Sequence, residues 1–132
     1  MVAWPVEPDD FDPSVLITDD NETWRGLVDD ILAQAGFRTL QAACGEEAIE
    51  VVRTERIDIV LIDFHMPRLD GIQTLRIIRR DGHWQPAVIM TAQPSDLPVA
   101  EVEALRVESV LEKPADRDRI VTTITRVIRW QR

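Results

Sequence analysis

Three carboxylates, one hydroxyl and the only lysine of this 132-residue chain stand where short apolar runs end. Asp19 and Asp20 follow the first run, Asp63 the third, Thr91 the fourth and Lys113 the fifth. Carboxylate oxygens on a rigid edge suit a hard divalent cation such as Mg²⁺, and a carboxylate beside such a metal can attack phosphorus to form an aspartyl-phosphate. A lysine and a hydroxyl can neutralise and hydrogen-bond phosphate oxygens. These residue types together indicate phosphoryl-transfer chemistry.

The elements that must position these side chains follow from the alternation of apolar runs and amphipathic stretches. The pattern predicts strands over 15–18, 37–43, 57–62, 87–90 and 109–111. Apolar residues at helical spacing predict helices over 24–35, 45–55, 71–80, 99–105 and a last one after Asp116. Strands that are apolar on both faces indicate a parallel sheet with helices on each side. Ligands bind such open sheets at the carboxyl ends of the strands.

Length and composition set the domain organisation and exclude several classes of protein. The length fits one domain, which we place at 14–132, after a flexible tail at 1–13 that holds three prolines and four acidic residues. The net charge of −9 argues against a basic nucleic-acid-binding protein. The single cysteine excludes a disulfide-built secreted fold. No apolar run approaches the ~18 residues that cross a bilayer. We therefore expect a cytoplasmic domain without a nucleic-acid or membrane partner.

The sequence resembles the receiver domain of two-component response regulators over about residues 14–130. Four motifs carry this resemblance, in order and at the ends of the expected strands: Asp-Asp at 19–20, VLIDFHMPRLDG at 60–71, Met-Thr-Ala at 90–92 and Glu-Lys-Pro at 112–114. The resemblance implies an α/β fold, a flavodoxin-like (βα)5 three-layer sandwich with a five-stranded parallel sheet of order 2-1-3-4-5. The expected protein is a phosphoacceptor signalling domain, not an enzyme with a separate substrate.

The resemblance also implies a role for each site residue. Asp63 would accept a phosphoryl group from a sensor histidine kinase or a histidine phosphotransfer protein. Asp20 and Asp63 would bind Mg²⁺ (or Mn²⁺) directly, Asp19 would bind it through water, and His65 would contribute its backbone carbonyl. Lys113 would neutralise a phosphoryl oxygen. The only chemistry of the domain itself would be self-phosphorylation and autodephosphorylation.

Thr91 would follow the phosphoryl group and shift the fourth helix, fifth strand and fifth helix between two states. That face would bind an output partner that the sequence does not identify. Four departures from the family pattern touch this face: Val110 replaces the usual switch aromatic, Arg106-Val107 replace Gly-Ala, Ala115 replaces phenylalanine, and Pro94 and Pro98 delay the fourth helix. We therefore expect intact input chemistry and an unusual signalling surface.

The same residues also have structural interpretations. Asp19 and Asp20 could cap the first helix, because aspartate is a favoured N-cap. Lys113 could be a surface residue before a turn proline, and Thr91 an ordinary β-branched strand residue. The Asp-Gly pair at 70–71 is typical of a turn and helix cap. The presence of all four site motifs favours the phosphoryl-transfer interpretation.

Two other functions stay open. A phosphorylation-independent, receiver-like protein-binding module would fit the substitution at Val110. A phosphohydrolase of the haloacid dehalogenase type would need a second aspartate two positions after Asp63, where His65 stands. Because the last helix ends with the chain, we expect a stand-alone receiver that binds a partner or relays the phosphoryl group. The side chains of His65 and Gln93 are candidates for tuning hydrolysis of the phosphoryl group.

Overall fold

The computed structural model describes residues 12–130, with the side chain of Trp130 left out. Most of the predicted tail therefore lies outside the described residues. The five strands form one parallel sheet in the order β2-β1-β3-β4-β5, as predicted. The strands are β1 (Ser14–Thr18), β2 (Arg38–Ala42), β3 (Ile59–Asp63), β4 (Ala87–Thr91) and β5 (Val107–Glu112). The helices are α1 (Glu22–Gln34), α2 (Gly45–Thr54), α3 (Gly71–Arg80), the short 3₁₀ helix η2 (Pro94–Asp96), α4 (Val99–Ala104) and α5 (Arg117–Trp130).

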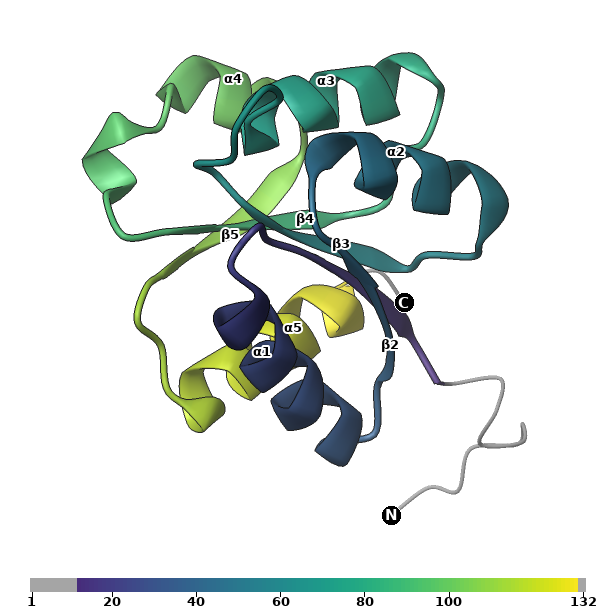
Figure 1. The fold of residues 1–132 in the computed structure, drawn as a ribbon, viewed down its shortest axis with the longest axis vertical. Helices are drawn as coiled ribbons and strands as arrows, with labels where there is room; N and C mark the ends of the chain where they lie inside the picture. Colours follow the sequence, from purple (N-terminus) through teal and green to yellow (C-terminus); the bar gives the residue numbers. More distant parts are fainter. Residues whose placement is uncertain (1–11, 131–132) are drawn as a thin grey trace.

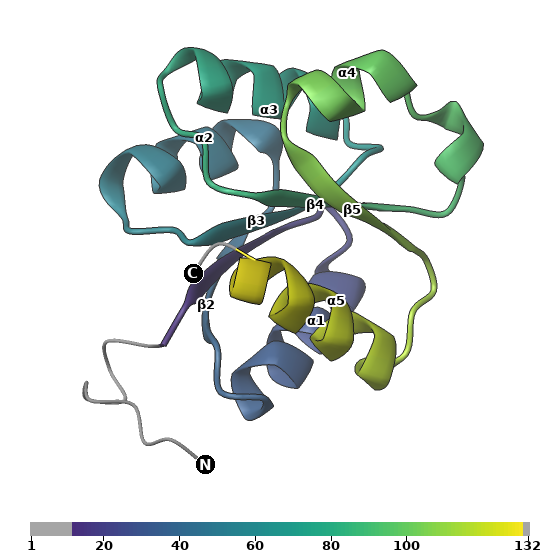
Figure 2. The same cartoon turned by 180° about the vertical axis from the view of Figure 1, so that it is seen from behind.

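Two helical layers enclose the sheet. Helices α1 and α5 cover one face, and α2, α3 and α4 cover the other (Figures 1 and 2). The pleat of β1 explains this division, because Val15 and Ile17 pack in the core on the α1 and α5 side while Leu16 packs on the opposite side. All residues of β1, β3 and β4 are buried. That burial explains why these central strands read as continuous apolar runs.

Short polar side chains start the helices that flank the carboxyl edge of the sheet. Asn21 caps α1 by accepting a hydrogen bond from the Trp24 backbone N–H, so neither Asp19 nor Asp20 is the cap. Asp70 forms a capping box with Gln73 at the start of α3, as its position before Gly71 predicted. Because Asn21 caps α1, the side chains of Asp19 and Asp20 are available to a site at the strand ends.

The fifth strand and the segment before the fourth helix differ from the sequence-based expectation. Strand β5 begins at Val107, two residues earlier than predicted, with a register irregularity opposite Ala87/Val88. It lies at the sheet edge and carries exposed Glu108, which breaks the apolar run that the prediction relied on. Helix η2 was not predicted. Pro98 stands at the N-cap of α4, which accounts for the delayed start of that helix.

A buried arginine fixes the turn between α4 and β5. Arg79 of α3 is 4% exposed and donates hydrogen bonds to the backbone carbonyls of Leu105 at 2.8 Å and His83 at 2.9 Å. Burial, followed by the nearby charge of Arg106, lowers the pKa of Arg79 to about 10. Arg106 adopts a positive φ of 58°, at the position where the family usually has glycine. The hydrogen bonds of Arg79 therefore stabilise a turn that arginine rarely adopts.

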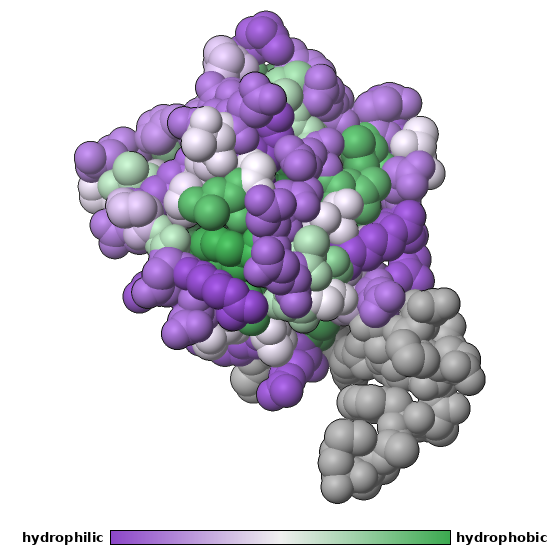
Figure 3. Space-filling view, turned by 60° about the horizontal axis from the view of Figure 1, so that its bottom comes forward, coloured by the Kyte–Doolittle hydropathy of each residue, from purple (hydrophilic) through white to green (hydrophobic). Residues whose placement is uncertain are grey.

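The face seen in Figure 3, on the side of α1 and α5, is largely polar, with apolar area among the hydrophilic groups. Leu27 of α1 is 49% exposed. Within residues 12–130, none of the helices combines the length and apolar composition that crossing a bilayer requires.

Candidate functional site

Parallel pairing brings the predicted site residues to one edge of the sheet. Thr18 is level with Ile62 in the β1–β3 pair, so Asp19 and Asp63 follow at the same height. Thr91 ends β4, and its carbonyl accepts a hydrogen bond from the backbone N–H of Lys113 at 2.9 Å. The carboxyl ends of β1, β3, β4 and β5 thus meet where the sequence analysis expected a ligand site.

The ammonium group of Lys113 joins two buried carboxylates. Its Nζ atom lies 2.7 Å from Asp19 Oδ2 and 3.0 Å from Asp63 Oδ1. Asp19 is fully buried and Asp63 is 5% exposed, while the Lys113 side chain keeps 20% exposure. Such short contacts in a dehydrated setting are charge-assisted hydrogen bonds. They hold Lys113 directly beside the candidate phosphoacceptor.

The surroundings of Asp63 favour the protonated, neutral form of its carboxyl group. Burial raises the pKa of Asp63 to about 6; the Lys113 hydrogen bond opposes this rise, and the charges of Asp19 and Asp20 add to it. Burial alone would lower the pKa of Lys113, but the hydrogen bonds to Asp19 and Asp63 outweigh it, and that pKa is raised. Lys113 therefore stays charged, while Asp63 becomes a carboxylate only above about pH 6.

The three carboxylates fit a hard divalent cation. Asp19, Asp20 and Asp63 each offer one oxygen, and these oxygens lie within 4.8 Å of one another. Asp20 is exposed, so the cluster is open to solvent on its side. Lys113 contacts two of the three carboxylates, Asp19 and Asp63, and its one positive charge leaves two of the three negative charges for a cation to balance. An all-oxygen, doubly negative donor set is typical of Mg²⁺ sites.

Two further predicted residues stand beside this cluster in the chain, Thr91 at the end of β4 and His65 on the loop after β3. Thr91 is fully buried, and its Oγ1 accepts a hydrogen bond from the Gln93 backbone N–H at 3.0 Å. The exposed side chain of His65 lies with its Nε2 atom 3.4 Å from Asp96 Oδ2 in η2. The contact between His65 and Asp96 links the loop after Asp63 to the loop after Thr91.

The loop after the candidate phosphoacceptor depends on Gly71, which the sequence pattern predicts as part of an Asp-Gly turn and helix cap. A Cβ atom at Gly71 would lie 2.5 Å from the carbonyl oxygen of Asp63. The Gly71 backbone N–H donates to the Phe64 carbonyl at 2.8 Å and closes the loop. The Asp-Gly signal was visible in the sequence, but the contact with Asp63 depends on where the sheet places α3.

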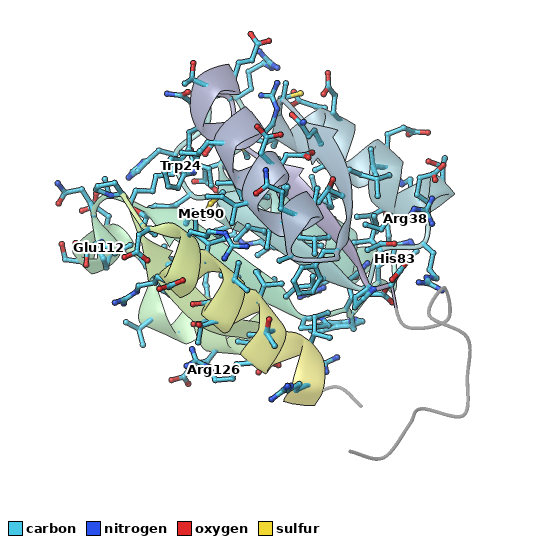
Figure 4. All side chains as sticks on the ribbon, turned by 90° about the horizontal axis from the view of Figure 1, so that it is seen from below. Trp24, Arg38, His83, Met90, Glu112 and Arg126 are labelled. Carbon is cyan, nitrogen blue, oxygen red and sulfur yellow. The ribbon has the colours of Figure 1, made fainter. Side chains whose placement is uncertain are left out.

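Trp24 is a second neighbour of the site that sequence reasoning missed. Its ring lies 5.8 Å from Lys113 Nζ, measured to the ring centroid. Figure 4 shows Trp24 and Met90 at the same end of the sheet as Glu112, with Arg38 and His83 at the opposite end. Trp24 belongs to the apolar spacing of α1, a pattern that predicts only an ordinary core residue.

Comparison with known proteins agrees with this geometry. The response regulator receiver domain family matches residues 15–125. The Vibrio cholerae CAI-1 autoinducer sensor kinase/phosphatase CqsS is 29% identical over 123 residues, which make up 91% of this chain and 18% of that protein. The Escherichia coli transcriptional regulatory protein CpxR is 30% identical over 115 residues, which make up 87% of this chain and 49% of that protein. The chain thus spans less than half the length of either relative.

Solved structures show the same fold. The Vibrio cholerae chemotaxis response regulator CheY4 superposes with a TM-score of 0.80 at 27% identity, over 87% of this chain and 98% of that one. The receiver domain of the Francisella response regulator 1452 gives a TM-score of 0.82 at 26% identity, over 91% and 99%. The family match and the shared sheet order lead to one conclusion: the chain belongs to the response regulator receiver domains of two-component signalling.

Proposed function

We propose that Asp63 accepts a phosphoryl group from the phosphohistidine of a sensor histidine kinase or a histidine phosphotransfer protein, in a Mg²⁺-dependent reaction. The observation that carries this proposal is the ammonium of Lys113, held at 2.7 Å from Asp19 and 3.0 Å from Asp63 at the carboxyl edge of the sheet. A purely structural ion pair would not need the exposed third carboxylate of Asp20 beside it.

The reaction would proceed by direct displacement. A carboxylate oxygen of Asp63 forms a bond to phosphorus as the phosphorus–nitrogen bond of the phosphohistidine breaks, and the imidazole nitrogen keeps the bonding electrons. Lys113 neutralises a phosphoryl oxygen, and Thr91 hydrogen-bonds another once the group is attached. The nucleophile is the ionised carboxylate, which predominates above the Asp63 pKa of about 6.

The cluster of three carboxylates, whose oxygens lie within 4.8 Å of one another, supports a metal site here. Asp20 and Asp63 would bind Mg²⁺ directly, Asp19 would act through a water molecule, and the backbone carbonyl of His65 would complete the protein ligands. Mn²⁺ would serve in its place. When bound, the cation supplies charge neutralisation for the phosphoryl oxygens.

The relatives and the surface of α1 support a phosphohistidine protein as the donor. CqsS and the Vibrio harveyi relative LuxN are named sensor kinase/phosphatases, which supports a phosphohistidine donor for this chain. Helix α1 begins two residues after Asp20 and exposes Leu27, so it offers the donor some apolar area. We place this reaction in the cytoplasm and expect phosphohydrolysis only of the domain's own phosphoryl group.

The output would be read on the face formed by α4, β5 and α5. A groove lies between β5 and α5 there, and Val110 lines it together with polar residues that include Ser109, Thr122, Thr123 and Arg126. Val110 stands where most family members have an aromatic residue that changes rotamer. The output partner of this chain would therefore contact the groove directly, and phosphorylation would act through Thr91 and the loop that carries η2.

Intact mass measurement tests the proposal. The protein is incubated with acetyl phosphate, with and without Mg²⁺, beside Asp63→Asn and the matched exposed variant Asp30→Asn. We expect one phosphoryl adduct that requires Mg²⁺, persists in Asp30→Asn and is lost in Asp63→Asn. The proposal is wrong if neither acetyl phosphate nor a phosphorylated kinase yields an adduct, a result that favours a phosphorylation-independent binding module. Turnover of generic phosphate esters would instead indicate a hydrolase.

A further inference from the structure

Trp24 is held by one hydrogen bond from its backbone and one from its indole ring. Its backbone N–H donates to the Asn21 side chain at 2.9 Å, within the N-terminal cap of α1. Its indole Nε1–H donates to Met90 Sδ at 3.4 Å. Met90 is fully buried in β4, directly before Thr91. The backbone of Trp24 lies in α1 and its indole N–H is bonded to β4. The half-buried ring therefore has little freedom to turn.

The ring closes the third side of the Lys113 ammonium. Two sides of that group contact the carboxylates of Asp19 and Asp63, and the centroid of the indole lies 5.8 Å from Nζ. That distance falls within the ~6 Å at which a cation and an aromatic face attract each other, and indole attracts more strongly than the other rings. Partial burial of both side chains strengthens the attraction.

The contact between Trp24 and Lys113 would matter most when Asp19 and Asp63 interact with the metal and the phosphoryl group. Under the proposed function, on which this inference rests, Asp19 serves the metal and Asp63 forms a bond to phosphorus, so both present anchors of Lys113 are weakened. We propose that Trp24 is a positioning residue, whose ring face keeps the Lys113 ammonium beside Asp63 while the metal and the phosphoryl group occupy the carboxylates. The link from the ring to Met90 would tie this position to the strand that ends in Thr91.

The chain contains a matched control for this idea. Arg79 lies 5.3 Å from the ring centroid of Trp84, a similar cation–aromatic pair. That guanidinium is already held by the hydrogen bonds that it donates to the backbone carbonyls of Leu105 and His83. Removing the Trp84 ring therefore leaves a cation with other anchors, far from the candidate phosphoacceptor.

The single lysine makes the proposal directly measurable by NMR. Labelling with [¹³C,¹⁵N]lysine gives one set of side-chain signals, all from Lys113. We expect ring-current shifts of its methylene signals in the wild type, their loss in Trp24→Leu, their partial retention in Trp24→Phe, and no change in Trp84→Leu. On titration with Mg²⁺, the wild-type ring-current shift should persist or grow. Identical Lys113 signals in wild type and Trp24→Leu, or loss of the shift on adding Mg²⁺, would overturn the proposal.

Phosphorylation rates provide a second readout. We expect Trp24→Leu to accept phosphoryl groups from acetyl phosphate about 3- to 10-fold more slowly, from the size of a cation–aromatic contact. Trp24→Phe keeps a ring and should restore the rate to within about twofold. A Trp24→Phe rate as low as that of Trp24→Leu would show that the ring face is not the cause. If the wild type accepts no phosphoryl group, the proposed function fails, while the NMR result still decides whether Trp24 positions Lys113.

Discussion

Replacing the Asp63 carboxylate by an amide should make the metal-free protein more stable. Burial raises the pKa of Asp63 from 3.8 to about 6, with Lys113 opposing and Asp19 adding to the effect. Ionising this side chain therefore costs more free energy in the folded protein than in the unfolded chain. The protonated Asp63 side chain contributes favourably to stability, fully so below pH 3.8, and this contribution is lost as the pH rises through about 6.

The size of the effect follows from the two pKa values. A tenfold change in a protonation equilibrium is worth about 1.4 kcal/mol, so the interval from 3.8 to about 6 corresponds to about 3 kcal/mol. In a domain of this size, 1 kcal/mol moves Tm by about 4 °C. In EDTA and at mildly alkaline pH, Asp63→Asn should therefore melt about 10 °C above the wild type.

Thermal unfolding followed by circular dichroism over a series of pH values tests this expectation. The gap between Asp63→Asn and wild type should shrink as the pH falls and vanish below 3.8, the usual pKa of the side chain. Mg²⁺ should also narrow the gap at alkaline pH, because it stabilises the wild type by binding the folded state. Asp30→Asn, at an exposed position of α1, controls for the loss of one negative charge. A mutant no more stable than wild type at alkaline pH would refute the electrostatic reasoning.

Three further expectations concern the surroundings of Asp63. Gly71→Ala should lower the free energy of unfolding, measured in urea, by about 2 kcal/mol, because its Cβ atom would meet the Asp63 carbonyl. Gly26→Ala, in open space within α1, should instead raise the free energy of unfolding by about 0.5–1 kcal/mol. Equal effects of the two substitutions would contradict the packing argument. Lys113→Met should abolish phosphoryl uptake in the intact mass assay and destabilise the protein by about 3 kcal/mol at alkaline pH, because it leaves the buried carboxylates without their cation; normal uptake would remove Lys113 from the mechanism. His65→Ala and Gln93→Ala should change the rate at which the phosphoryl adduct is lost, and unchanged decay would exclude both side chains from hydrolysis.

The sequence predicted the fold and the residues at the strand ends because both depend on local patterns. Apolar runs mark strands that are buried on both faces, and in a parallel sheet the residues after those runs meet at one edge. Asp63 and Lys113 are 50 positions apart in the chain, yet this rule alone brings them together. Asp70 as a helix cap was equally visible, because capping depends only on neighbouring residues.

Features that depend on tertiary packing could not be predicted. The sequence does not distinguish Asp19 from its neighbour Asp20. In the structure Asp19 is fully buried and Asp20 is exposed, since successive side chains along an extended backbone point in opposite directions. Burial of Arg79 depends on carbonyls more than 20 positions away in the chain. The contact of Trp24 with Lys113 requires α1 and the end of β5 to meet, and helical periodicity carries no information about which residue lies opposite.

Chemical trapping of the phosphorylated protein identifies the side chain that carries the phosphoryl group, which we propose to be Asp63. The phosphorylated protein is reduced with borohydride, which converts an aspartyl-phosphate to homoserine, and is then digested with trypsin. Cleavage after Arg56 and Arg68 releases the peptide 57–68, which contains Asp58 and Asp63. We expect homoserine at position 63 only, and only when Mg²⁺ was present during phosphorylation. Homoserine at position 58, 19 or 20, or its formation without Mg²⁺, would contradict it.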